Sequence, residues 1–125
     1  MDCAAVDLTP ATAPAETAES SWQRFGEVVD ELLLLLDLLG RAPEGQRRPV
    51  YAKCVPLIKE IGLLNKPPYD VRKVKALIFE ASWHLRSLAG LAATNSSGDD
   101  EHAAWALASL EGLAVCAKLR LAAAR

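Results

Sequence analysis

The stretch Glu27–Arg41 reads EVVDELLLLLDLLGR and contains five consecutive leucines, Leu32 to Leu36. It can be interpreted as a membrane span, as a helix buried on all sides, or as a helix that meets another protein or a lipid. A span needs about 20 predominantly apolar residues, and Asp30, Glu31 and Asp37 interrupt this run. The stretch therefore predicts a buried helix, because a helix that is apolar nearly all round is normally enclosed by others.

The helix predicted around this stretch begins at Ser20, whose side chain can cap the first N–H groups, and ends at Gly40. Apolar residues follow one another along it at steps of three and four, as on one face of an amphipathic helix. The residues that we assign to the core on this face are Trp22, Phe25, Val29, Leu32, Leu36 and Leu39. Residues 1–19 lack this periodicity and are rich in Ala, Thr, Pro and Glu, so we expect a disordered leader.

Three further helices are predicted, over about residues 49–64, from a cap at Asp70 to Gly90, and onward from Asp99 or Asp100. Pro56 lies inside the first of these, where the missing N–H predicts a kink. The core residues assigned on these helices are Leu57, Ile61, Val74, Ile78, Leu85, Leu107 and Leu110. Four amphipathic helices with short polar breaks predict an all-α protein, with an antiparallel four-helix bundle over residues 20–125.

The fourth helix is unusually rich in Ala and Leu and poor in charge. Ala103, Leu107 and Leu110 begin the face that we expect to meet the core. Trp105, Val115 and Leu119 form a second face. A second copy of the chain could complete the packing of such a helix, so a homo-oligomer is one expectation.

The net charge of the chain is −2 and its pI is about 5.7, which argues against a general nucleic-acid binder. The charge is unevenly distributed, because residues 1–40 hold eight acids and one base whereas residues 41–86 hold ten bases and four acids. The basic residues indicate either a solvated face or a surface for a protein partner or an anionic membrane. The residues we select for this surface are Arg47, Arg48, Lys53, Lys59, Arg72, Lys73 and Lys75.

Cys3, Cys54 and Cys116 are odd in number and far apart, which suits a reducing compartment better than a disulfide framework. The first twenty residues show no secretory signal, since they open with an acid and have no apolar core. We therefore expect a cytoplasmic protein, peripheral at the plasma membrane if it binds lipid.

No pattern typical of an enzyme is found, such as a glycine-rich phosphate loop or a Ser/His/Asp grouping, and no cofactor is implied. His102 follows contiguous acids, Asp99 to Glu101, which favour the N-terminus of a helix over a metal site. His84 suggests a histidine phosphotransfer protein as a distant alternative, since that family also forms four-helix bundles. In that family a Lys stands three positions after the reactive His and a Gly follows it. In this chain those two positions are Ser87 and Leu88.

Residues 51–91 resemble a group of plant helical domains. Lys53, Pro56, Leu57, Glu60 and Ile61 fall on one helix pattern of the N-terminal domain of plant U-box armadillo ubiquitin ligases. A second pattern of that domain is matched by Lys75, Ala76, Leu77 and Ala81. Residues 55–61 are similar to a helix of the powdery-mildew-resistance domain of helper immune receptors. MID1-complementing and HeLo-type bundles resemble the stretch 51–91 in the same way.

The resemblance implies a non-enzymatic helical-bundle module that binds partner proteins in regulation or signalling, in plant immunity or with a ubiquitin ligase. The alternative is a membrane-associating, oligomerising bundle of the cell-death type. In that case the leucine-rich helix would be released, and the bases would guide it toward anionic lipid.

Overall fold

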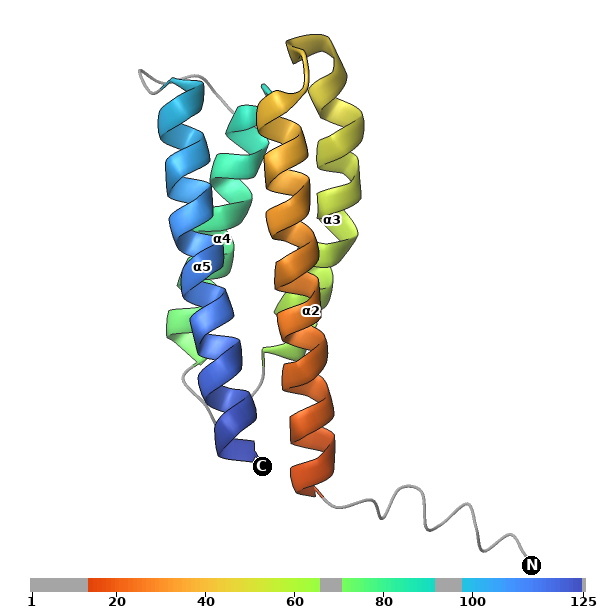
Figure 1. The fold of residues 1–125 in the computed structure, drawn as a ribbon, viewed down its shortest axis with the longest axis vertical. Coiled ribbons are helices and arrows are strands. Elements are labelled where there is room, and N and C mark those ends of the chain that lie inside the picture. The colour runs from red at the N-terminus through yellow and green to blue at the C-terminus, as the bar shows by residue number, and fades with distance from the viewer. Residues whose placement is uncertain (1–13, 66–70, 92–97, 125) are drawn as a thin grey trace, which may run out of the picture.

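The structure is a computed structural model that describes residues 14–65, 71–91 and 98–124. Within these ranges it consists of α-helices α2 (Pro14–Arg41), α3 (Arg47–Leu64), α4 (Val71–Leu88) and α5 (Asp99–Ala124), with a short 3-10 helix η1 (Glu44–Gln46) and no strand. The prediction of an all-α protein is thus confirmed. Successive helices run in alternate directions along the long axis (Figure 1).

The helix α2 begins at Pro14, six residues before the predicted start at Ser20. Proline is tolerated in the first helical turn because the N–H that it lacks has no helical acceptor there. Ser20 is exposed inside the helix and therefore caps nothing, and Gly40 is also helical because α2 continues to Arg41. Of the predicted leader, residues 1–13 lie outside the described residues.

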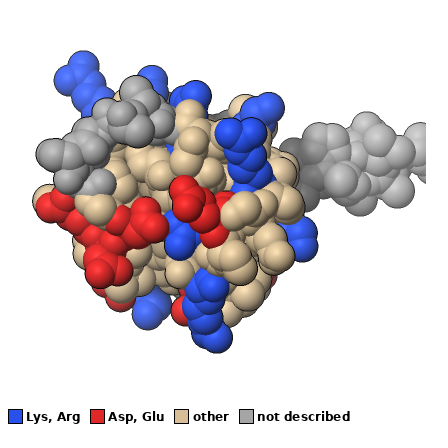
Figure 2. Space-filling view, turned by 90° about the horizontal axis from the view of Figure 1, so that it is seen from above, with Lys and Arg blue, Asp and Glu red and all other residues tan. Residues whose placement is uncertain are grey.

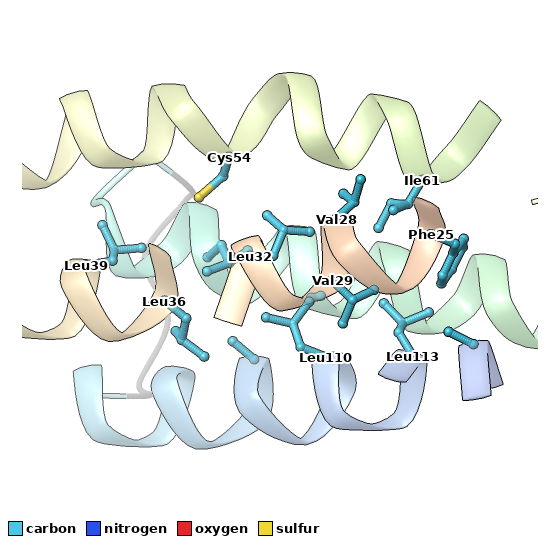
Figure 3. Packing of buried hydrophobic residues seen from close by; sticks show 14 of the residues in the cluster. Phe25, Val28, Val29, Leu32, Leu36, Leu39, Cys54, Ile61, Leu110 and Leu113 are labelled. Atoms are coloured by element: carbon cyan, nitrogen blue, oxygen red, sulfur yellow. The ribbon is translucent and has the colours of Figure 1, made fainter. Parts of the chain in front are cut away.

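The core is built around α2, which packs on α3 and along α5, while α5 also packs on α4. Phe25, Leu32 and Leu39 are completely buried on α2. Figure 3 shows the side chains of α2 between the labelled Cys54 and Ile61 of α3 and the labelled Leu110 and Leu113 of α5. The leucine-rich segment is therefore the central element of the packing, as its apolar pattern predicts.

Most residues assigned to the core from the sequence are buried, namely Trp22, Phe25, Val29, Leu32, Leu36, Leu39, Ile61, Val74, Leu85 and Leu110. Leu57 and Ile78 are only partly buried at its edge. The assignment of Leu107 is wrong, because its side chain is 42% exposed at a shallow hollow between α2 and α5. The face of α5 that meets the core is centred on Ala106, Leu110 and Leu113 instead.

The breaks between helices follow local chemistry. Gly90 ends α4 with a φ of 76°, and the N–H of Leu91 donates to the carbonyl of Arg86 while that of Gly90 donates to Ser87. This pair of hydrogen bonds is a Schellman motif, in which glycine takes the left-handed position. Asp70, the predicted cap of α4, lies outside the described residues. Pro56 stands inside α3, which continues through it to Leu64.

No helix in the described part of the chain combines the length and the hydropathy that crossing a membrane requires.

Candidate functional site

The seven basic residues selected from the sequence do not form one surface. Arg47 and Arg48 lie at the start of α3, at the upper end in Figure 1, whereas Arg72, Lys73 and Lys75 lie in the first turns of α4, at the opposite end. Seen from above, most basic side chains lie apart from one another around the rim, and acidic side chains lie on one side and near the centre (Figure 2). Because α3 and α4 run in opposite directions, their first turns lie at opposite ends of the molecule, which is why sequence proximity did not produce a patch.

Arg47 has a structural position and is not an open base. Its side chain is only 13% exposed and lies 2.8 Å from the carboxylate of Asp99. It also donates to the carbonyl of Ala42 at 3.0 Å and to that of Leu88 at 3.2 Å. The guanidinium therefore joins the end of α2, the end of α4 and the start of α5, so its assignment to a partner surface is corrected.

A groove of about 540 Å³ opens between α3 and α4, and it is the candidate binding site. It exists because α3 packs mainly on α2 and meets α4 much less, and because small residues stand along its walls. Its lining is mostly apolar and consists of Ile58, Gly62, Asn65, Val71, Lys75, Ile78, Phe79 and Ser82. Phe79 is 67% exposed in this lining.

Two polar residues, Lys75 and Asn65, lie in the lining of the groove. Lys75, one of the bases selected from the sequence, is exposed in its lining and supplies a cation. The amide nitrogen of Asn65 donates to the carbonyl of Val71 at 3.0 Å. The Oδ1 atom of Asn65 is buried and accepts no hydrogen bond from any described residue. Because this atom is buried, it does not face an occupant of the groove, and Lys75 is the polar group open to one.

A second site of interest is a histidine pair between α4 and α5. The Nδ1 atoms of His84 and His102 lie 2.9 Å apart, and His84 Nε2 lies 3.5 Å from a carboxylate oxygen of Glu80. Trp83 contacts both imidazoles, and Trp105 stacks on His84 at a centroid distance of 6.0 Å. When the proton of neutral His84 is on Nε2, facing Glu80, its Nδ1 accepts the Nδ1–H of His102.

Burial lowers the pKa of the His84 imidazole below its ordinary value, and the charge of His102 acts in the same direction. The carboxylates of Glu80 and Glu101 partly oppose this shift. Protonation of His84 is therefore disfavoured in the folded protein. His84 is only 13% exposed, which does not suit a histidine that must meet a second protein to receive a phosphoryl group.

Among the residues that the structure describes, no three His, Cys, Asp or Glu side chains gather in a way that could hold a metal ion. Cys54 is buried, and burial raises the pKa of its thiol to about 11, which suppresses the reactive thiolate at neutral pH.

Comparisons of the chain with protein-family models, with curated proteins and with solved structures found no match.

The sequence had indicated Lys75 but not its neighbours in the groove, nor the meeting of His84 with His102. Phe79 offered a signal, since it lies off the heptad-like face of α4 that contains Val74, Ala81 and Leu85. A large apolar residue outside the core face is a candidate for contact with a partner. The histidine pair left no signal, because its members are on different helices whose relative rotation is a tertiary property.

Proposed function

We propose that this protein is a non-enzymatic module, an antiparallel four-helix bundle, that binds a partner protein in regulation or signalling. The observation that supports this most is the apolar groove between α3 and α4, with Phe79 exposed in it. A groove between two helices of a bundle is the usual receptor for an amphipathic helix, which buries apolar residues at steps of three and four.

The lining defines the occupant more closely. Burying the exposed ring of Phe79 is worth about 1.5–3 kcal/mol, so this residue is the natural apolar anchor. Lys75, which is exposed in the lining, favours a carboxylate on the partner. We therefore propose an amphipathic helix that carries an acidic residue beside its apolar stripe. The resemblance of residues 51–91 to plant bundle domains suggests immune signalling or ubiquitin-ligase regulation in the cytoplasm as its context.

Selection of helical peptides from a display library on the wild-type protein tests this function. We expect binders with apolar residues at i, i+3 or i+4, and i+7, together with an acid. Their affinity should fall by about tenfold or more for Phe79→Asp, because the apolar anchor is lost. A smaller loss is expected for Lys75→Glu.

The matched control is Leu34→Asp, which puts the same charge on an equally exposed side chain of α2, away from the groove. This variant should bind the selected peptides as the wild type does. Peptides that bind Phe79→Asp undiminished would refute the groove as the binding site.

A second candidate function is association with an anionic membrane. The observation that favours it is that two exposed apolar residues, Leu63 on α3 and Phe79 on α4, each lie one helical turn from an exposed base, Lys59 and Lys75 respectively. Exposed apolar residues with neighbouring bases attach proteins to acidic lipid. Flotation with vesicles containing acidic lipid should then recover the protein, and added salt should release it. Absence of flotation, or flotation with neutral vesicles alone, rejects this function.

A further inference from the structure

The outward face of α5 carries a second apolar stripe that the other helices cover only at one edge, where Gly112 lies against Leu77 of α4 and Trp105 stacks on His84. Its residues follow one another at alternating steps of three and four, in the order Trp105, Ala108, Gly112, Val115, Leu119 and Ala122. The three large ones are 56%, 55% and 63% exposed, respectively. Alternating steps of three and four are the heptad spacing of a coiled-coil seam. The core is met by different residues of α5, such as Leu110 and Leu113, so this helix is apolar on two sides.

We propose that a second copy of this chain covers the stripe, with the two α5 helices antiparallel across a two-fold axis. In this orientation the outer layers join a large side chain to a small one, because Trp105 meets Ala122 of the second copy and Leu119 meets its Ala108. In the central layer Val115 lies beside Gly112 of the second copy, which Leu77 of α4 already covers in part. A parallel pairing would instead set Trp105 against Trp105 and leave small residues facing each other with voids between them, which close packing disfavours.

The charges beside the stripe support the same orientation. Glu111 and Lys118 are exposed and stand seven residues apart, so they occupy the same edge of the seam. Antiparallel pairing brings Glu111 of each copy to Lys118 of the other, which gives two equivalent ion pairs. Parallel pairing gives neither residue an opposite charge. Self-complementarity in both size and charge is what a two-fold interface between identical chains requires.

The α5 interface is separate from the groove of the proposed function. Among the described residues α5 contacts α2 and α4 but not α3, so a dimer through its outward face leaves the α3–α4 groove of each copy open. The protein then presents two grooves at once. If the protein forms a dimer but binds no peptide, only the proposal of the groove is refuted. If it binds peptides as a monomer, only the proposal of the dimer is refuted.

Sedimentation equilibrium over a range of protein concentrations is the first test. The wild-type chain should show a dimer, and Leu119→Glu should sediment as a monomer with unchanged helical circular dichroism, because Leu119 is outside the core. Leu63→Glu is the matched control, since Leu63 on α3 is 72% exposed and the stripe does not include it. A monomeric wild type, or a dimer that Leu119→Glu leaves intact, overturns the proposal.

Charge reversal tests the orientation without changing the apolar stripe. In a dimer of either single variant, Glu111→Lys or Lys118→Glu, both contacts between residues 111 and 118 join like charges. Each variant should therefore weaken dimerisation by about tenfold at low salt. An equimolar mixture of the two variants should associate as strongly as the wild type, because the mixed dimer restores both opposite pairs. A mixture no stronger than its separate components would exclude the antiparallel arrangement.

Discussion

The five consecutive leucines differ sharply in their surroundings. Leu32 is completely buried and Leu36 nearly so, whereas Leu34 is 68% exposed. We predict that Leu32→Ala lowers the free energy of unfolding by about 2–5 kcal/mol, because the truncated side chain leaves a cavity among α2, α3 and α5. Chemical denaturation measures this directly. Leu34→Ala is the control in the same run of residues and should change stability by no more than about 0.5 kcal/mol. Equal losses for both variants would contradict the packing of α2.

The histidine pair predicts a loss of stability in mild acid. Because the pKa of His84 is lowered in the folded protein, the unfolded chain binds a proton more readily. The contribution is therefore complete above the ordinary histidine value, about 6.5. It is lost as the pH falls from there through the folded-state pKa.

Thermal melting at pH 7.5 and pH 5 checks this, with His84→Gln as the comparison. The wild type should lose more melting temperature between the two pH values than the variant, which has no imidazole at this position to titrate. Because Trp83 and Trp105 contact the pair, their fluorescence should change over the same pH range. Identical pH dependence in both proteins would show that the pair does not titrate in this way.

At the scale of elements, α2 and α5 show when an apolar pattern identifies the core face. Charges mark the solvent side of α2, so the predicted face was correct. The helix α5 has few charges, and its apolar residues surround it, so Leu107 and Leu110 looked equivalent in the sequence. We predict that Leu110→Ala costs about 2–5 kcal/mol of stability and Leu107→Ala less than about 1 kcal/mol, since only Leu110 is enclosed. Urea unfolding of the two variants measures both losses. A larger loss of stability for Leu107→Ala than for Leu110→Ala would show that the rotation of α5 is wrong.

Two glycines near the ends of helices should change stability in opposite directions when they are replaced by alanine. Gly90 has a left-handed backbone conformation, so Gly90→Ala should destabilise the protein by about 1–2 kcal/mol. Gly62 is helical and has open space around it, so Gly62→Ala should stabilise by about 0.5–1 kcal/mol. Melting temperatures measure both changes. A stabilising Gly90→Ala would mean that α4 does not end in a Schellman motif.

At the scale of the whole molecule, α3 is the least firmly integrated helix. It buries only Cys54 and Ile61, whereas α4 and α5 bury four and six residues. Its ion pair with α2, between Arg24 and Glu60 at 2.6 Å, is partly exposed to solvent. We predict faster amide hydrogen exchange in α3 than in the centre of α2 or α5, because a helix with few buried contacts opens more easily. Uniform protection across the helices would contradict this ranking.

The amino-acid sequence determined the helical class of the protein, the central place of the leucine-rich segment and the end of α4 at Gly90. These follow from interactions within a few residues of the chain, namely apolar spacing and the conformational freedom of glycine. The start of α2 was predicted six residues late, because a capping side chain shows only where a helix can begin.

Only the tertiary structure decided how the helices turn toward one another. It distributed the bases over both ends of the molecule, brought Arg47 to three acceptors, opened the groove beside Phe79 and brought His84 to His102. The physical reason is that each of these features depends on the rotation and spacing of two or more helices. Rotation is set by the summed packing of many side chains, which no local pattern in an almost uniformly apolar helix such as α5 can specify.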